Sequence, residues 1–148
     1  MTSIFTTLPQ LAAYHMALVA LCVLTLAVLI QSFLTVPFAF GNGKQINGMP
    51  LKGGHDDLSF RVVRTHSNST ENFGPFFAAV FLAIIAGAHV TWVNWLAFAH
   101  VGFRLLYWAI YYSGTGKVAA GPRSMAYAAG WFTNLGIAGL AFYALIAG

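Results

Sequence analysis

The chain has 148 residues, of which 59% are apolar or aromatic and only 7% are charged, and its formal net charge at neutral pH is +4. A soluble domain carries about 25% charged residues, because its surface must stay hydrated. Seven basic and three acidic side chains cannot cover such a surface. The composition therefore excludes a soluble enzyme, a nucleic-acid-binding module and a disordered chain. The single cysteine, Cys22, also excludes intramolecular disulfides and cysteine-based zinc clusters.

Four apolar stretches are long enough to cross a membrane, which takes about 20 residues for about 30 Å of hydrocarbon. They cover about residues 11–38, 73–90, 92–112 and 124–147. The first is too long for a cleavable signal peptide and has no basic start, so we expect it to be retained as a helix. The predicted fold is all-α: an integral membrane four-helix bundle that forms one domain over residues 1–148.

The polar segment at about 39–58 is rich in glycine and asparagine and predicts a long loop between the first two helices. The basic residues gather in this loop and around the third connection: Lys44, Lys52, Arg61, Arg64, Arg104, Lys117 and Arg123. The positive-inside rule then predicts that the first and third loops are cytoplasmic and that both termini lie on the opposite side. The membrane would be a bacterial inner membrane or the endoplasmic reticulum.

The second helix is expected to begin near Asp57, outside the membrane, and to carry a polar stripe into it. At about 100° per residue, Arg64, Asn68 and Glu71 lie within about 60° of one another. An unpaired acid at this depth is costly, so Glu71 should face the bundle interior and meet a partner. Two interpretations stay open: an ion pair with Arg64 or Arg104 that holds the helices together, or part of a ligand site.

The third and fourth helices bring similar groups to the same depth. Arg104, Tyr107 and Tyr111 lie at i, i+3 and i+7 and share one face of the third helix. The fourth helix is expected to open at Pro122, and its first turns carry Arg123, Ser124 and Tyr127. Several guanidinium groups and one carboxylate at one depth favour a pocket for a small zwitterionic or anionic ligand.

The five histidines show none of the spacings that a metal-binding helix needs, so no metal site is expected. His15, His89 and His100 stand alone in or near the apolar stretches, and we expect them to be packing or interfacial residues. His55 lies in the first loop.

Taken together, these residues resemble the motifs of the membrane-associated proteins in eicosanoid and glutathione metabolism. The second helix reads Arg64-x-His66-x-Asn68-x-x-Glu71-x-x-x-Pro75. The later helices carry Arg104, Tyr107 and Tyr111, and then Arg123-Ser124-x-x-Tyr127. The resemblance covers almost the whole chain, in its size, its four predicted spans, its long first loop and the order of the motifs.

The resemblance implies a homotrimer in which glutathione binds between neighbouring subunits, near the cytoplasmic side. It implies that the glutathione site is lined by Arg64, His66, Asn68, Glu71, Arg104, Tyr107, Tyr111, Arg123 and Tyr127. Glu71 would hold the γ-glutamyl amino group and the arginines the carboxylates, and the tyrosines would reach the ligand from a partner helix. Arg123 would stabilise the thiolate as a catalytic residue, with Ser124 assisting. The implied activity is a membrane glutathione transferase or peroxidase that acts on a lipophilic electrophile or a lipid hydroperoxide.

Three departures from the family pattern keep other functions open. Ser67 and Tyr107 stand where some members carry arginine and histidine, and the first helix offers no arginine. These losses favour the main alternative, a non-catalytic lipid- or glutathione-binding scaffold of the same fold. A remote alternative is a small proton-coupled exporter that uses Glu71. The surrounding arginines disfavour it, because they would hold this carboxyl ionised.

Overall fold

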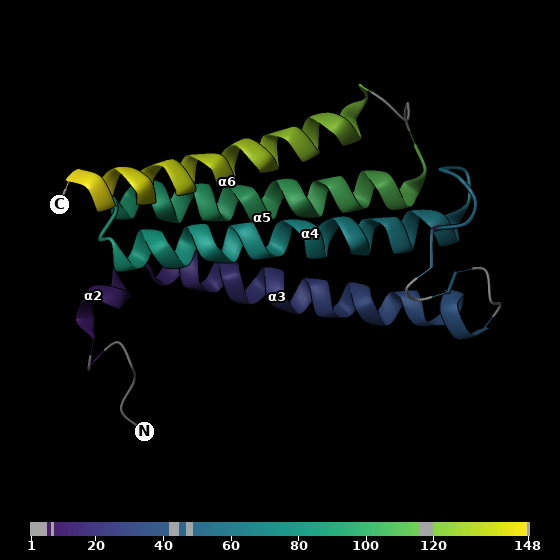
Figure 1. Ribbon diagram of the computed structural model, residues 1–148, viewed down its shortest axis with the longest axis horizontal. Coiled ribbons are helices and arrows are strands. Elements are labelled where there is room, and N and C mark those ends of the chain that lie inside the picture. The colour runs from purple at the N-terminus through teal and green to yellow at the C-terminus, as the bar shows by residue number, and fades with distance from the viewer. Residues whose placement is uncertain (1–5, 7, 42–44, 47–48, 116–119, 148) are drawn as a thin grey trace.

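The computed structural model contains four long helices that lie side by side (Figure 1). It describes residues 6, 8–41, 45–46, 49–115 and 120–147. The long helices are α3 (His15–Val36), α4 (Leu58–Ile85), α5 (Val90–Ser113) and α6 (Pro122–Ala147). A short helix, α2 (Pro9–Ala12), precedes α3, and a π-helical turn, η1 (Pro37–Gly41), follows it. No strand occurs in the described ranges, so the predicted all-α class is confirmed.

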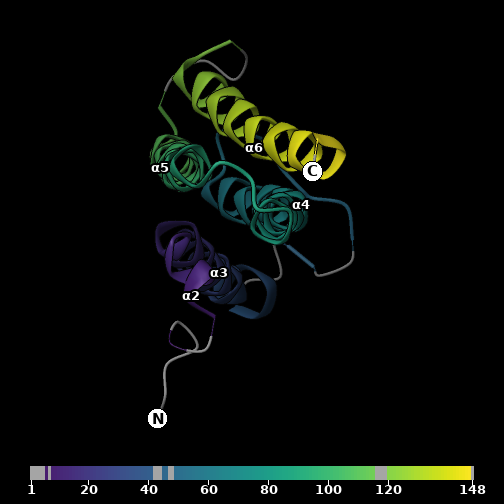
Figure 2. The same ribbon diagram turned by 90° about the vertical axis from the view of Figure 1, so that its left-hand side faces the viewer.

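Successive long helices run in opposite directions (Figure 1). Seen end-on, α4 and α5 occupy the middle of the molecule, and each contacts α3 on one side and α6 on the other (Figure 2). The segment between η1 and α4 therefore lies at the same end as the connection from α5 to α6, while α2 and the last turn of α6 lie at the opposite end. Of the cations in these two connections, Lys44 and Lys117 fall outside the described residues.

The first long helix starts later than predicted, at His15 rather than near residue 11, because the helical conformation is interrupted between α2 and α3. In an unbroken helix the Ala17 N–H would donate to the Ala13 carbonyl. Here the side chain of Asn94, from α5, stands between them. Its Oδ1 accepts from the Ala17 N–H at 2.9 Å, and its Nδ2 donates to the Ala13 carbonyl at 2.8 Å. One amide from a distant helix thus satisfies both backbone groups.

The start of α4 agrees with the sequence prediction, whereas its end does not. The Asp57 carboxylate accepts a hydrogen bond from the Ser59 N–H at 2.9 Å and so caps the first turn. The helix ends at Ile85, before the predicted residue 90. Gly87 has φ +66°, and the following N–H, of Ala88, donates to the carbonyl of Ala83. This left-handed glycine closes the helix, because it satisfies the last carbonyls without strain.

Two features favour glycine at the end of α5. Gly114 has φ +70°, which side chains with a Cβ disfavour, and a Cβ there would lie 3.0 Å from the guanidinium carbon of Arg61 in α4. The next helix opens at Pro122, as the sequence predicted, since a proline in the first turn loses no helical hydrogen bond.

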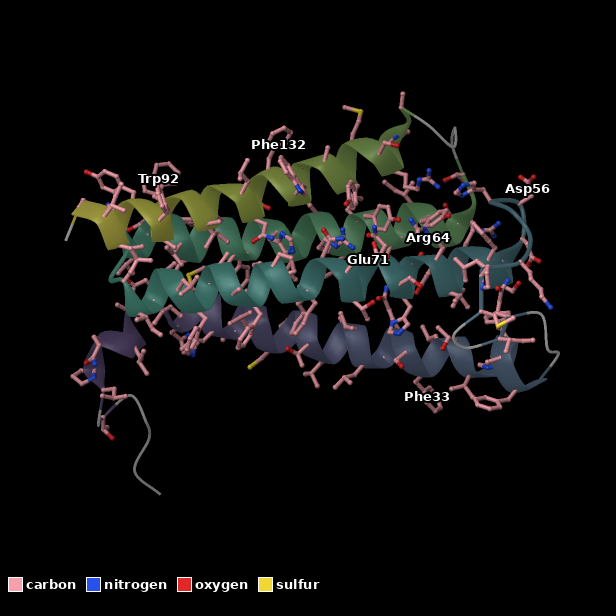
Figure 3. The ribbon with its side chains drawn as sticks, in the orientation of Figure 1. Phe33, Asp56, Arg64, Glu71, Trp92 and Phe132 are labelled. Atoms are coloured by element: carbon pink, nitrogen blue, oxygen red, sulfur yellow. The ribbon has the colours of Figure 1, made fainter. Side chains whose placement is uncertain are left out.

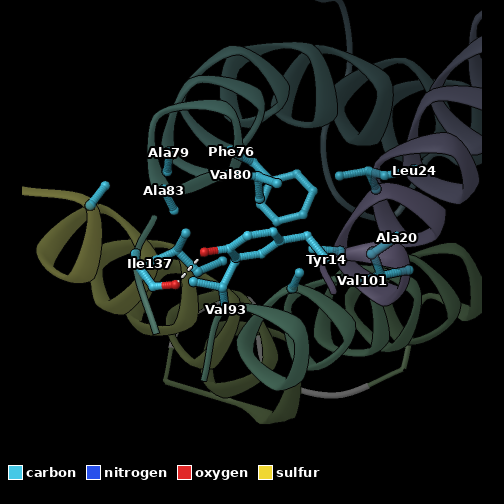
Figure 4. Packing of buried hydrophobic residues seen from close by; sticks show 14 of the residues in the cluster. Tyr14, Ala20, Leu24, Phe76, Ala79, Val80, Ala83, Val93, Val101 and Ile137 are labelled. Atoms are coloured by element: carbon cyan, nitrogen blue, oxygen red, sulfur yellow. Dashed lines mark hydrogen bonds between the residues drawn. The ribbon is translucent and has the colours of Figure 1, made fainter. Parts of the chain in front are cut away.

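Small side chains dominate the contacts between the helices. Fully or almost fully buried alanines come from all four long helices: Ala17, Ala20, Ala79, Ala83, Ala97 and Ala141. Phe76, Val80 and Ile137 fill the space between them (Figure 4), and the Tyr14 hydroxyl donates to the Ala88 carbonyl. Small residues let helix backbones approach closely, which is how helices associate inside a membrane.

Large apolar side chains cover the outside of the helices. Phe33, Trp92 and Phe132 project outward and are 74%, 60% and 64% exposed (Figure 3). A soluble monomer rarely exposes so much apolar surface. Within the described residues, two segments are long and apolar enough to cross a membrane: His15–Phe40, with a mean hydropathy of 2.5, and α6, with 1.4. The other two long helices do not meet the same criterion of composition.

We expect Asn94→Ala to lower the thermal midpoint of the detergent-solubilised protein, because it leaves the Ala13 carbonyl and the Ala17 N–H without their partner. The Ala17 N–H is buried, and an unsatisfied buried group costs about 1–3 kcal/mol. Asn134→Ala is the matched control, since the side-chain oxygen of Asn134 has no hydrogen-bond partner among the described residues. Equal losses in the two variants, measured by scanning calorimetry, would show that the Asn94 contact does not hold the start of α3.

Candidate functional site

A cavity of about 460 Å³ lies between α4, α5 and α6, at the end of the helices where α4 begins. Pockets for small molecules typically enclose about 300–1,000 Å³. The side chains that line it are His55, Phe60, Arg64, Asn68, Glu71, Tyr107, Tyr111, Arg123, Ser124 and Tyr127. All except His55 and Phe60 are residues that the sequence predicted for the site. One chain therefore brings most of the predicted set together, including the three tyrosines expected from a partner helix.

Two side chains of opposite charge, Arg64 and Glu71, line the cavity from α4. The Arg64 Nη1 lies 3.9 Å from the Glu71 Oε1, and the two side chains are 46% and 59% exposed (Figure 3). The expectation that Glu71 faces the interior is thus wrong for a single chain, because more than half of its side chain is exposed. An exposed pair at this distance contributes little to stability. Both groups still line the cavity, where a ligand could engage them.

Arg104 lies behind the cavity wall rather than in it. Its side chain is 2% exposed, and its Nη2 donates to the Asn68 Oδ1 at 2.6 Å. The guanidinium carbon also lies 5.1 Å from the centre of the Tyr107 ring and 5.6 Å from that of Tyr127, within the range of cation–π attraction. Arg104 therefore fixes Asn68 and two tyrosines that face the cavity, and has no open path to a ligand itself.

Aromatic rings form the wall opposite α4. The ring centre of Tyr107 lies 5.7 Å from that of Tyr111 and 5.9 Å from that of Tyr127, so one continuous surface joins α5 to α6. The guanidinium carbon of Arg123 lies 4.4 Å from the centre of the Tyr111 ring. This stacking holds a second cation, from the first turn of α6, at the mouth of the cavity beside Ser124.

His55 and Phe60 are the lining residues that sequence reasoning missed. The His55 Nδ1 lies 2.6 Å from the Tyr111 hydroxyl oxygen and 3.1 Å from the Arg123 Nη1. The imidazole meets the Phe60 ring edge to face, with centres 5.2 Å apart. Phe60 stands four residues before Arg64, so helical periodicity could have identified it. His55 precedes the helix, and no periodic pattern extends to it.

The surroundings of His55 keep its imidazole neutral at neutral pH. Burial lowers the pKa of His55 below its ordinary value, and the nearby charges of Arg123 and Arg64 lower it too, while Asp56 acts in the opposite direction. A guanidinium can only donate, so the ring nitrogen that faces Arg123 must accept. The ring proton of the neutral form therefore lies on Nε2.

His66, predicted for the same site, lies on another side of α4. It lines a second cavity, of about 470 Å³, together with Ser67, residues near the end of α3 and residues of the loop before α4. Arg64 and Glu71 line both cavities. The two hollows therefore meet along one exposed surface of α4.

We expect the substitutions Arg104→Met and Asn68→Ala to be strongly non-additive in a double-mutant cycle. Either one removes the buried charge-assisted hydrogen bond, which contributes about 1.5–3 kcal/mol, so the double variant should lose less than the sum of the two single losses by about that amount. The measurement is the free energy of unfolding in detergent. Arg104→Met combined with Asn134→Ala should give additive losses, since no contact joins that pair among the described residues. Additive losses for Arg104 and Asn68 as well would contradict the coupling.

The comparison with protein families agrees with the motifs on α4, α5 and α6. No curated protein matches the chain at a significant level. A family model with the description MAPEG family matches residues 15–143, a range that contains all four long helices except the last turn of α6. MAPEG proteins are membrane helical bundles, consistent with the two helices here that are apolar enough to cross a membrane. Since this match covers most of the chain, the protein belongs to the MAPEG family.

Proposed function

We propose that the protein is a membrane glutathione transferase or peroxidase that binds glutathione in the cavity between α4, α5 and α6. The observation that carries the proposal is the match of charges. Two guanidinium groups, of Arg64 and Arg123, and one carboxylate, of Glu71, line the cavity. Glutathione offers the complement, with two carboxylates and one ammonium group. The volume of about 460 Å³ also lies in the range of pockets that hold small molecules.

Each charged residue then has a role that its chemistry suits. Glu71 accepts hydrogen bonds from the γ-glutamyl ammonium group, while Arg64 pairs with a carboxylate of the ligand. The Asn68 amide, whose oxygen is held by Arg104, offers its N–H groups. Tyr107 and Tyr127 supply hydroxyl groups or ring faces to the peptide between the charged ends.

Glutathione supplies the nucleophile, a thiol that ionises with a pKa of about 8.5 in water. The Arg123 guanidinium lowers that pKa by stabilising the negative sulfur, and Ser124 stands beside it as a further donor. A shift of two pKa units corresponds to about 2.7 kcal/mol of differential interaction, which one well-placed arginine can supply. The thiol proton leaves to water. With an electrophile, the sulfur forms a C–S bond while the leaving group departs or the adduct takes up a proton. With a hydroperoxide, the sulfur attacks the terminal oxygen and the O–O bond breaks to release the alcohol, and a second glutathione then converts the resulting sulfenic acid to the disulfide and water.

The proposed assembly is a homotrimer with four spans in each subunit, cytoplasmic first and third loops and termini on the opposite side. The exposed surface of α4 supports a neighbour at this place, because Arg64 and Glu71 are left open to the side within one chain. A subunit packed there would enclose the ligand. The second cavity, with His66, opens on the same surface and would bring that residue toward a ligand shared between subunits.

We expect Glu71→Gln to weaken glutathione binding, measured by isothermal titration calorimetry on the detergent-solubilised protein. The variant loses one charge-assisted hydrogen bond to the ammonium group, about 1.5–3 kcal/mol, or roughly 10- to 150-fold in Kd. Arg64→Ala should weaken binding as well. The matched control is Asp56→Asn, which removes the same charge at the same end of the helices but from a residue that does not line the cavity. An unchanged Kd for Glu71→Gln would mean that the amino group binds elsewhere.

Arg123→Ala should abolish turnover with a lipophilic electrophile while the assembled protein stays intact. The reason is that the thiolate loses its stabilising cation. Turnover is followed as conjugate formation, and assembly by size-exclusion chromatography in detergent. Full turnover in this variant would remove Arg123 from the mechanism. Wild-type protein that binds glutathione without any conjugation or peroxidase reaction would support the alternative, a non-catalytic binding scaffold.

A further inference from the structure

His55 connects the segment before α4 to the helices on the far side of the cavity. Its Nδ1 is within hydrogen-bond distance of two groups, the Tyr111 hydroxyl of α5 at 2.6 Å and the Arg123 Nη1 of α6 at 3.1 Å. The Tyr111 ring also stacks on the same Arg123 guanidinium, at 4.4 Å. The arginine at the cavity mouth is therefore held from one side by a ring face and from another by a ring nitrogen.

The backbone of His55 is itself fixed, so the imidazole is not simply a mobile loop side chain. The Arg61 Nη1 donates to the His55 carbonyl at 2.9 Å and to the Asp56 carbonyl at 3.0 Å. On its other side the Arg61 guanidinium packs against Gly114, where a side chain would have to displace it. The Phe60 ring packs edge to face against the imidazole. The end of α5 and the first turn of α4 thus set the position of the ring.

We propose that His55 is a positioning residue that holds Arg123 in the cavity, and that only its neutral imidazole can do so. The proposal rests on the proposed function, in which Arg123 stabilises the glutathione thiolate. His55 contributes the acceptor that orients the guanidinium, and Tyr111 shares that acceptor. Protonation of Nδ1 would turn the acceptor into a donor and place a second cation 3.1 Å from Arg123, so the contact would break.

The charged and titratable groups around the imidazole come from every element packed against it. They are Asp56 beside it, Arg61 and Arg64 on α4, Tyr111 on α5 and Arg123 on α6. Three of these are cations and one is an acid, so the neutral ring is favoured. The low pKa of His55 that follows from burial and from Arg123 keeps the contact intact at neutral pH and confines its loss to acid solution.

The first test reads His55 directly and needs no glutathione. Nitrogen-15 NMR of histidine-labelled protein in detergent, assigned with His55→Asn, should show the neutral ring protonated on Nε2 and a pKa below the ordinary 6.5. Arg123→Gln should raise this pKa, because a neighbouring cation is removed. Lys52→Gln, which removes a charge at the same end without contacting His55, should not. A neutral ring protonated on Nδ1 would overturn the proposal, and so would a His55 pKa that is the same in wild type and in Arg123→Gln.

The second test measures the consequence for bound glutathione through the ultraviolet absorbance of its thiolate. His55→Leu should reduce the acidity of the bound thiol by about tenfold, the loss expected when one charge-assisted hydrogen bond to Arg123 is removed. His55→Asn should recover most of it, because the asparagine Oδ1 supplies an acceptor near the position of Nδ1. His89→Asn, at an exposed position at the opposite end of the helices, is the control for the substitution itself.

The two tests separate a failure of this proposal from a failure of the proposed function. If wild-type protein binds no glutathione, the proposed function is wrong, and the NMR titration alone decides whether His55 holds Arg123. If glutathione binds and its thiol is equally acidic in wild type and His55→Leu, the proposed function stands and the positioning role is wrong. Equal losses in His55→Leu and His55→Asn would also reject it, since an acceptor would then not be what Arg123 requires.

Discussion

The buried guanidinium of Arg104 is the interaction on which the site depends, because it joins three helices behind the cavity. It belongs to α5, donates to Asn68 of α4 at 2.6 Å and lies against the Tyr127 ring of α6. A buried charge is costly unless it is hydrogen-bonded or paired, and here one guanidinium nitrogen has an acceptor while the cation lies against two aromatic rings. The requirement works in both directions: Arg104 needs these partners, and they in turn are held in one arrangement. The floor of the cavity is therefore set before any ligand arrives.

The sequence predicted the parts of this arrangement that follow from local chemistry. Asp57 and Pro122 mark the starts of α4 and α6 because a cap and a first-turn proline act within a few residues of themselves. Helical periodicity likewise predicted that Arg64, Asn68 and Glu71 share one side of α4, and all three line the cavity. Such features depend on residues within a single helix, so they can be predicted from the sequence alone.

What the sequence could not predict depends on contacts between distant segments. The break before α3 exists because Asn94 reaches across from α5, and nothing near residue 13 signals it. His55 enters the cavity because Arg61 holds its carbonyl, a contact that has no periodicity. Glu71 was expected inside, since an acid in an apolar segment needs a partner, but that argument does not say whether the partner belongs to the same chain. Within one chain the group is open, which supports the neighbouring subunit that the proposed site includes.

The four long helices differ in mean hydropathy, and the difference depends on where their polar residues lie. The mean hydropathy of α4 and α5 is too low to identify them as membrane spans, and these two helices provide most of the polar cavity wall. They also turn large apolar side chains outward: Phe77, Phe81, Ile85, Trp95, Phe98 and Leu106. Mean hydropathy over a stretch of consecutive residues averages the polar inner face of a helix with its apolar outer face, although only the outer face would meet lipid. The residues that α6 adds to the cavity, Arg123, Ser124 and Tyr127, lie in its first two turns, so the rest of that helix stays apolar. The lower mean hydropathy of α4 and α5 comes from polar residues along their length, Arg64, Asn68 and Glu71 in α4 and Asn94, His100 and Arg104 in α5. It is compatible with the proposed four spans.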